Sequence, residues 1–150
     1  MVLYHYTVME HFKKIVESEK IKRATKHLGP KEKPAVHLSS NPEWEMTVKK
    51  TPLGLSDAVG LRNHSHLIPV RIKIEAEACN IIPWRVFKKR SGISAKMARF
   101  LEKRGKEMGA DPKQWYCSFE DIPLGVCLSV EFWDGEWCLI PEVDREKGEG

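Results

Sequence analysis

Hydrophobic and polar residues alternate most regularly over residues 67–75, where every second side chain from position 68 to 74 is apolar. A period of two places the apolar side chains on one face of a strand and the charged ones on the other. Pro69 lies in this run and indicates either an edge strand or the start of a strand, because proline donates no backbone hydrogen bond. Shorter apolar runs predict two further strands, at residues 2–6 and 35–39.

Two apolar runs near the end of the chain, residues 124–133 and 136–140, flank Asp134 and Gly135. An Asp-Gly pair between apolar runs is a strong signal for a two-residue hairpin turn. We therefore predict an antiparallel β-hairpin here. Residues 80–87 predict another short extended piece, interrupted by a proline.

The first helix is expected directly after the strand at residues 2–6. Thr7 is the expected N-cap, and Glu10 follows three residues later, as in a capping box. Apolar residues recur at helical spacing over residues 9–16, which predicts one buried face. The helix should fade near residues 18–20.

Two later helices are predicted from their first residues. Asn41 and Pro42 suit the N-cap and the first helical position, and they predict a short helix as far as Val48. Ser94 suits the N-cap of a longer helix that ends at Gly109, because glycine readily closes a helix in the left-handed conformation.

This order of elements predicts an α+β fold, because the helices do not alternate regularly enough with the strands for a doubly wound sheet. We expect a single compact domain over residues 1–143, with a short-stranded, mixed and mostly antiparallel sheet and flanking helices. A chain of 150 residues is long enough for one core of its own. Residues 51–65 predict an irregular, mobile segment, and residues 144–150 a flexible charged tail.

The chain is mildly basic, with a formal net charge of +4 at pH 7. Basic residues are densest between Lys88 and Lys106, where they indicate either a solvated helix face or a phosphate-binding patch. No apolar run approaches the roughly 20 residues that span a bilayer, and the N-terminal residues lack a signal-peptide pattern. We therefore expect a cytoplasmic protein without membrane partners.

The four cysteines, Cys79, Cys117, Cys127 and Cys138, show no C-x-x-C spacing. This excludes the usual pattern of a redox dithiol or a zinc ribbon, and together with the expected location it predicts four reduced structural thiols. His64 and His66 lack a nearby third ligand, so we predict no metal site.

Candidate chemistry begins where the first strand ends. His5 and Thr7 lie two residues apart, so an imidazole and a hydroxyl there can both face a cleft and hydrogen-bond a ribose or an amide. The alternative is a packed histidine beside a helix cap.

The second strand offers a similar pattern, since His37 and Ser39 share one of its faces. Trp44, shortly after it, offers a flat surface on which a ring can stack, or it belongs to the core. Later in the chain, Glu120 follows an aromatic segment and suits an acid, a base or a cation-stabilising group, or else an acidic turn. Glu131, inside an apolar strand, is the second candidate carboxylate.

LYHYT, followed by an amphipathic helix, a loop and a short strand ending in VHLSSNP, resembles the opening of small ADP-ribosyltransferase-like proteins. The resemblance covers the N-terminal third of the chain, with a looser echo near residues 115–133. The chain is also similar to uncharacterised short prophage and mobile-element proteins, through the patterns S-x-N-P-x-W-E and W-Y-x-S-F-E-x-I-P.

In that family, a His-x-Thr on the first strand binds the nicotinamide-ribose part of NAD. A second strand brings a hydroxyl or aromatic residue to the site, and a later strand brings a carboxylate. The resemblance implies the following NAD site: His5 and Thr7 on the first strand, Ser39 or Ser40 on the second, and Glu120, ahead of Glu131, as the carboxylate.

The function that this resemblance implies is NAD-dependent ADP-ribosyl transfer to a macromolecule, either protein or nucleic acid. Cleavage of the nicotinamide–ribose bond develops positive charge on the sugar, which a carboxylate stabilises. His5 and Glu120 would then be catalytic, Trp44 would contact the cofactor, and Arg71 would hold the pyrophosphate or be solvated. Two alternatives stay open: a non-enzymatic phage or mobile-element protein that binds or inhibits a host component, and an RNA-processing enzyme that acts on phosphate.

Overall fold

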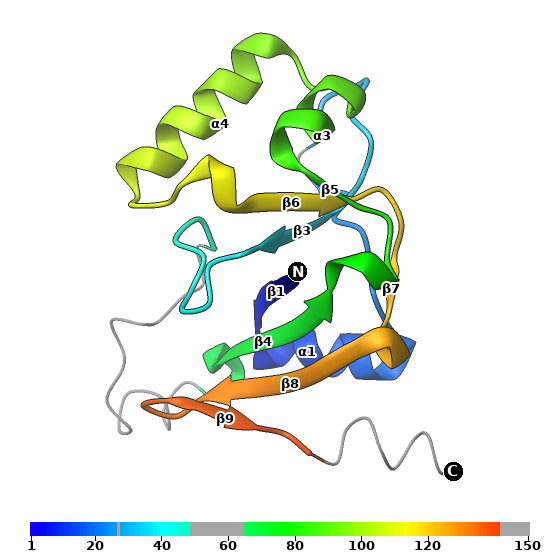
Figure 1. The fold of residues 1–150 in the computed structure, drawn as a ribbon, viewed down its shortest axis with the longest axis vertical. Coiled ribbons are helices and arrows are strands. Elements are labelled where there is room, and N and C mark those ends of the chain that lie inside the picture. Colours follow the sequence, from blue (N-terminus) through cyan, green and yellow to red (C-terminus); the bar gives the residue numbers. More distant parts are fainter. Residues whose placement is uncertain (27, 49–64, 142–150) are drawn as a thin grey trace.

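The computed structural model describes residues 1–26, 28–48 and 65–141. It has a compact α+β fold around a seven-stranded sheet of order β5-β6-β3-β1-β4-β8-β9, with β2 and β7 paired separately (Figure 1). Every pair of neighbouring strands is antiparallel. The predicted α+β class and mostly antiparallel sheet are therefore confirmed.

The elements have the following bounds. The strands are β1 Val2–Val8, β2 Lys20–Ile21, β3 Val36–Ser39, β4 Pro69–Glu75, β5 Ile81–Pro83, β6 Trp115–Ser118, β7 Ile122–Pro123, β8 Cys127–Trp133 and β9 Trp137–Leu139. The α-helices are α1 Met9–Ser18, α3 Trp84–Arg90 and α4 Ala95–Glu107. Short 3-10 turns are Ser65–Leu67, Ala76–Ala78, Pro112–Gln114 and Leu124–Val126.

One face of the sheet packs against α1 and forms the main core. The alternation predicted for β4 is confirmed, since Val70, Ile72 and Ile74 are fully buried there. Phe12 and Ile15 of α1 belong to the same apolar cluster. Pro69 is the first residue of β4, so it marks the start of a strand that is central in the sheet.

The other face carries a second, smaller apolar cluster beneath α3 and α4. Trp84 and Phe87 of α3 and Ala98 of α4 pack there against Cys117 of β6. In Figure 1 these two helices lie beyond the β5-β6-β3 end of the sheet, while α1 lies at the other end, in contact with β1 and β4. The sheet therefore separates two apolar clusters.

The predicted capping box at Thr7 is wrong. β1 continues through Thr7, which pairs with Val70, and ends only at Val8. Val8 occupies the N-cap position and makes no side-chain capping bond. β-branched residues favour a strand, and here the ladder with β4 extends the strand past the local helix signal.

The predicted helix from Asn41 to Val48 is also wrong, because these residues form turns. Asn41 Oδ1 accepts the backbone N–H of Glu43 at 2.9 Å, a local bond that competes with helix formation. Trp44 and Glu45 are adjacent in sequence and both buried, at 2% and 7% exposed. The tertiary contacts that bury both residues therefore outweigh the local helix-start signal of Asn41 and Pro42.

The remaining predictions are mostly confirmed. Ser94 Oγ caps α4 by accepting the N–H of Met97 at 3.1 Å. β8 and β9 form the predicted hairpin, although Trp133 pairs with Trp137 and the loop therefore has three residues, with Gly135 at φ 82°. Residues 80–87 are extended only as far as Pro83, after which α3 begins. The predictions for residues 51–64 and for the tail lie outside the described residues.

Candidate functional site

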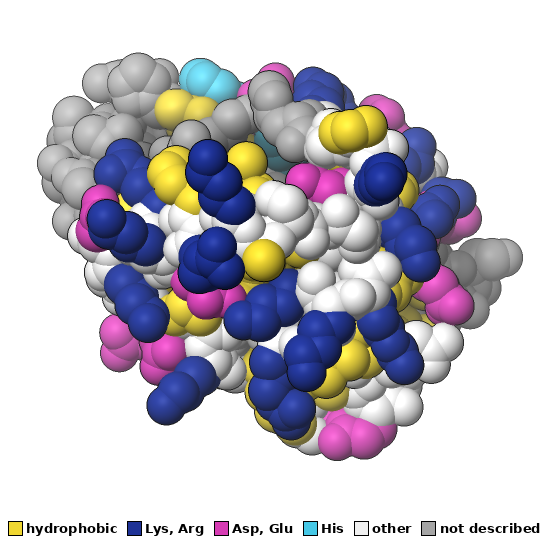
Figure 2. Space-filling model, turned by 90° about the horizontal axis from the view of Figure 1, so that it is seen from above, with side chains coloured by type: hydrophobic (Ala, Val, Ile, Leu, Met, Phe, Trp, Pro, Cys, Tyr) yellow, Lys and Arg dark blue, Asp and Glu magenta, His cyan; other side chains and the backbone are white. Residues whose placement is uncertain are grey.

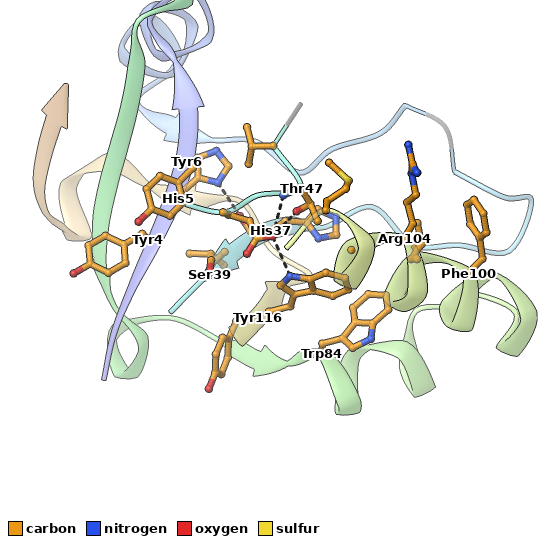
Figure 3. Close-up of a pocket in the computed structure, with 17 residues that line it drawn as sticks. Tyr4, His5, Tyr6, His37, Ser39, Thr47, Trp84, Phe100, Arg104 and Tyr116 are labelled. Atoms are coloured by element: carbon orange, nitrogen blue, oxygen red, sulfur yellow. Dashed lines mark hydrogen bonds between the residues drawn. The ribbon is translucent and has the colours of Figure 1, made fainter. Parts of the chain in front are cut away.

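A cavity of about 420 Å³ opens where β1, β3 and β6 meet α4 and the turns after β3 (Figure 3). We call it the central cavity. Its size is within the usual range for small-molecule sites. Its walls are mainly aromatic and apolar, with few polar groups. The residues that line it are Tyr4, His5, Tyr6, His37, Leu38, Ser39, Glu45, Thr47, Val48, Trp84, Phe100, Leu101, Arg104, Gly105, Met108, Trp115 and Tyr116.

Glu45 places a carboxylate in this aromatic cavity. Its Oε2 accepts three hydrogen bonds, from Thr47 N at 3.2 Å, Thr47 Oγ1 at 2.6 Å and Trp115 Nε1 at 3.1 Å. Within the described part of the chain, Oε1 accepts none. One carboxylate oxygen therefore holds the side chain in place, and the other is not engaged by any residue that the structure describes.

His5 lies in a gap between two strands. β1 and β3 pair at one position, Tyr4 with Ser39, and the imidazole of His5 reaches the carbonyl of His37 across the gap at 2.9 Å. A carbonyl oxygen only accepts, so Nδ1 of His5 donates this bond and Nε2 remains an acceptor. Desolvation by the surrounding protein lowers the pKa of His5 to about 4, so the ring is neutral at pH 7.

His37 lines the same cavity from β3. Its Nδ1 lies 3.4 Å from Sγ of Cys117, whose thiol pKa burial raises to about 12. That thiol stays protonated and can donate to Nδ1, which would leave the ring hydrogen of His37 on Nε2. His37 is exposed, and yet the protein around it lowers the pKa of its imidazole by desolvation. The cavity thus has two neutral imidazoles on adjacent strands.

The two candidate serines have local partners. Ser39 Oγ accepts the N–H of Asn41 at 3.1 Å and lines the central cavity, although it is 1% exposed. The backbone N–H of Ser40 donates to Gln114 at 2.9 Å, and its side chain does not line the central cavity. Of the two, the structure brings only Ser39 together with His5.

Thr7 faces the opposite side of the sheet. It lines a separate cavity of about 280 Å³ beside α1, which His5 also borders from the strand gap. His11 and Lys14 of α1 line that cavity as well. His5 and Thr7 therefore lie together, as the spacing predicts, but Thr7 is separated from Ser39 by the sheet.

Trp44 and Arg71 form part of an aromatic cluster next to the central cavity. Trp44 stacks on Trp137 at 6.2 Å and packs on Tyr6 at 4.8 Å, so it belongs to the core. The guanidinium of Arg71 lies between the rings of Tyr4 and Trp137, at 5.0 and 4.6 Å from their centroids.

All the side-chain nitrogens of Arg71 have partners. Nε donates to Glu131 Oε1 at 2.9 Å, Nη2 to Glu131 Oε2 at 3.3 Å, and Nη1 to the carbonyl of Pro42. Arg71 and Glu131 face each other on β4 and β8. They therefore anchor the turns after β3 to the sheet, and neither lines the central cavity.

Glu120 lies away from the central cavity. Glu120 comes two residues after Ser118, the last residue of β6, which pairs with the first residue of β3. Ser39 is at the other end of β3, where it pairs with Trp115. Asn80 donates to both carboxylate oxygens of Glu120, at 3.3 and 3.4 Å. Glu120 lines a different cavity of about 240 Å³ near β7, so the structure does not bring it together with His5 or Ser39.

The comparisons and searches give no direct identification. No protein-family model, curated protein or solved structure matches this chain. Among the described residues, no group of three or more His, Cys, Asp or Glu side chains lies close enough together to hold a metal ion. None of the helices that the structure describes is long and apolar enough to span a bilayer.

Sequence reasoning missed Glu45 and Trp115 as site residues. Nothing in the predicted helix over residues 41–48 indicated that the side chain of Glu45 is buried. Its partner Trp115 lies 70 residues later in the chain. The one sequence signal that marks Glu45 is its place in the S-x-N-P-x-W-E pattern.

Proposed function

We propose that the central cavity binds NAD and that the protein catalyses ADP-ribosyl transfer from it, with Glu45 as the carboxylate. One observation carries the proposal: a buried carboxylate, one oxygen of which accepts no hydrogen bond from any described residue, shares an aromatic cavity with His5 and Ser39. The resemblance of the LYHYT and VHLSSNP segments to ADP-ribosyltransferase-like proteins supports the same chemistry.

The proposed reaction breaks the bond between C1′ of the ribose and the nicotinamide nitrogen. The electron pair leaves with nicotinamide, and positive charge develops on the ribose. A fixed carboxylate next to that charge stabilises the transition state more than the ground state. A nucleophile of the target, or water, then forms a bond to C1′ and releases a proton.

The neighbouring groups suit this substrate. The neutral imidazole of His5, at the border of the cavity, keeps Nε2 as an acceptor, and the aromatic walls offer surfaces on which rings can stack. Arg104, exposed on α4, lines the same cavity and can pair with a phosphate. Arg71 is not needed for this role, since each of its side-chain nitrogens already has a partner in the protein.

The test is calorimetric titration of NAD, with release of nicotinamide as the measure of turnover. We expect wild type to bind NAD. Glu45→Gln should keep NAD affinity within a few-fold and lose about a hundredfold or more in turnover, because it removes the charge and keeps the shape.

Two variants control this experiment. Glu43→Gln removes the same charge from an exposed position two residues away and should behave as wild type. Glu120→Gln tests the carboxylate that the resemblance predicts, and it should also keep its turnover. No heat from wild type at millimolar NAD would contradict the proposal, and loss of turnover in Glu120→Gln alone would move the carboxylate to Glu120.

A further inference from the structure

The face formed by α3 and α4 is strongly basic. Between residues 85 and 106 the chain has nine basic residues and one acidic residue. All the basic side chains except Lys88 are exposed: Arg85, Lys89, Arg90, Lys96, Arg99, Lys103, Arg104 and Lys106. Figure 2 looks onto this side of the molecule, and Lys and Arg side chains cover much of it, with few acidic ones between them.

Little of this charge is neutralised by the residues that the structure describes. The one acidic residue of the segment, Glu102, accepts from Lys88 Nζ at 2.8 Å and from Trp84 Nε1 at 2.6 Å. Arg104 contacts Glu107 at 3.6 Å. The other exposed basic side chains of α3 and α4 form no ion pair with any described residue. The face therefore offers its positive charge to an external partner.

On α4 the basic residues form a stripe. Lys96, Arg99, Lys103 and Lys106 recur at intervals of three or four residues and so share one side of the helix. They span about 15 Å along the axis, at 1.5 Å per residue. A linear array of cations of this length matches the backbone of an extended polyanion better than it matches a single phosphate.

An apolar stripe runs beside the basic one. Met97, Phe100 and Leu101 are 43%, 57% and 38% exposed, although they are large and apolar. Phe100 (Figure 3) and its neighbour Leu101 also line the central cavity. An exposed aromatic ring beside a row of cations is the arrangement with which proteins bind single-stranded nucleic acid, because phosphates pair with the cations and bases stack on the ring.

We infer that the α3–α4 face binds single-stranded nucleic acid, with phosphates along the basic stripe of α4 and a base on Phe100. The strand would pass the rim of the central cavity. A duplex fits the face less well, because its bases are not available to stack on Phe100. This binding does not depend on the NAD reaction proposed above, so each proposal can fail alone.

The test is fluorescence anisotropy of a labelled 15-nucleotide oligo(dT) and oligo(U), titrated with the full chain at several salt concentrations. We expect binding of both strands that weakens with salt, with a slope of log K against log salt of about −3 for four phosphate contacts. Arg99→Gln/Lys103→Gln should reduce the magnitude of that slope by about 1.4. Lys13→Gln/Lys14→Gln on α1, across the sheet, removes the same charge and should leave the slope unchanged.

Phe100→Ala separates stacking from charge. It should weaken oligonucleotide binding about five- to a hundredfold and leave the salt slope unchanged, while Phe100→Tyr should bind as wild type. Retained secondary structure and a cooperative urea transition in the variants would show that they are folded.

Several results would overturn the inference: no oligonucleotide binding by wild type at low salt, equal losses in the α4 and α1 double variants, or no effect of Phe100→Ala. Equal affinity for duplex DNA, for polyglutamate or for anionic vesicles would also overturn it, since these polyanions offer no base to stack. Loss of NAD binding alone would contradict only the transferase proposal.

Discussion

His5 has two roles that can be separated at the scale of a single residue. Its Nδ1–H bridges the gap between β1 and β3 by donating to the carbonyl of His37. His5 is also one of the residues that line the central cavity, and this is its proposed second role. The first role contributes to stability and depends on pH, because the folded protein holds the imidazole in its uncharged form.

The pH dependence follows from the two pKa values of His5. Its pKa falls from an ordinary 6.5 to about 4 on folding, so the unfolded chain takes up the proton first. The stability that depends on neutral His5 is therefore complete above pH 6.5 and is lost as the pH falls towards 4. We expect the urea midpoint of wild type to fall more between pH 7 and pH 4.5 than that of His5→Asn.

Asparagine is a suitable replacement in this experiment because its side-chain amide can donate to the same carbonyl and does not titrate. The carboxylates and His37 are present in both proteins, so the difference between the two pH profiles isolates His5. Parallel profiles for His5→Asn and wild type would show that His5 is protonated equally in the folded and unfolded states.

The candidate site shows what single residues reveal in a sequence. His5, Thr7 and Ser39 were found because the sequence predicts strand ends near them, and two of them line the central cavity. Position along the chain does not show that Glu45, and not Glu120, lines the central cavity, because the burial of a carboxylate depends on partners from distant elements. Trp115 supplies that partner for Glu45, and no spacing within residues 39–48 predicts it.

At the scale of elements, α4 lies close to the sheet because Gly105 has no side chain. A Cβ at this position would lie 2.6 Å from Cζ2 of Trp115. The approach keeps α4 over β6 and shapes one wall of the central cavity. Gly105, which weakens a helix by its intrinsic preference, is thus needed here for packing.

Gly105→Ala should therefore destabilise the protein even though alanine favours helix by about 1 kcal/mol. Overpacking against the Trp115 ring costs about 1–3 kcal/mol, so we expect a net loss of up to about 2 kcal/mol in the free energy of unfolding. Urea denaturation followed by tryptophan fluorescence measures it.

Gly125→Ala is the matched control, because a Cβ there meets no atom within 4 Å and its φ is not positive. We expect a change within about 0.5 kcal/mol for this variant. A Gly105→Ala protein more stable than wild type would show that α4 moves away from Trp115 at little cost.

The elements that sequence reasoning predicted well are those defined by local pattern: β4 by alternation, α4 by its Ser94 cap, and the hairpin by Asp134 and Gly135. The predictions that failed lie where tertiary contacts oppose a local signal. Thr7 pairs with β4 in place of capping a helix. α3 was missed because its seven residues are too few for a periodic pattern, and its burial of Trp84 and Phe87 depends on Cys117.

At the scale of the whole molecule, the sheet has an apolar cluster on each face, and the central cavity borders the smaller one. Cys117 belongs to that cluster and is fully buried beneath α3 and α4. None of the four cysteines, all within the described part of the chain, forms a disulfide. The rate at which each thiol reacts therefore measures how readily the protein around it opens to solvent.

A thiol-specific reagent should find four thiols in the denatured protein without reductant, because no disulfide consumes them. In the native protein at pH 7.5, Cys117 should react far more slowly than Cys79 or Cys138, which are partly exposed. Burial excludes the reagent and raises the Cys117 pKa to about 12, so very little thiolate is present.

Two variants test whether the slow phase of the native reaction belongs to Cys117. It should disappear in Cys117→Ala and accelerate in Gly105→Ala, since both α4 and Cys117 belong to the smaller apolar cluster. Fewer than four thiols after denaturation, restored by reductant, would contradict the reduced state, and four equal native rates would contradict the burial of Cys117.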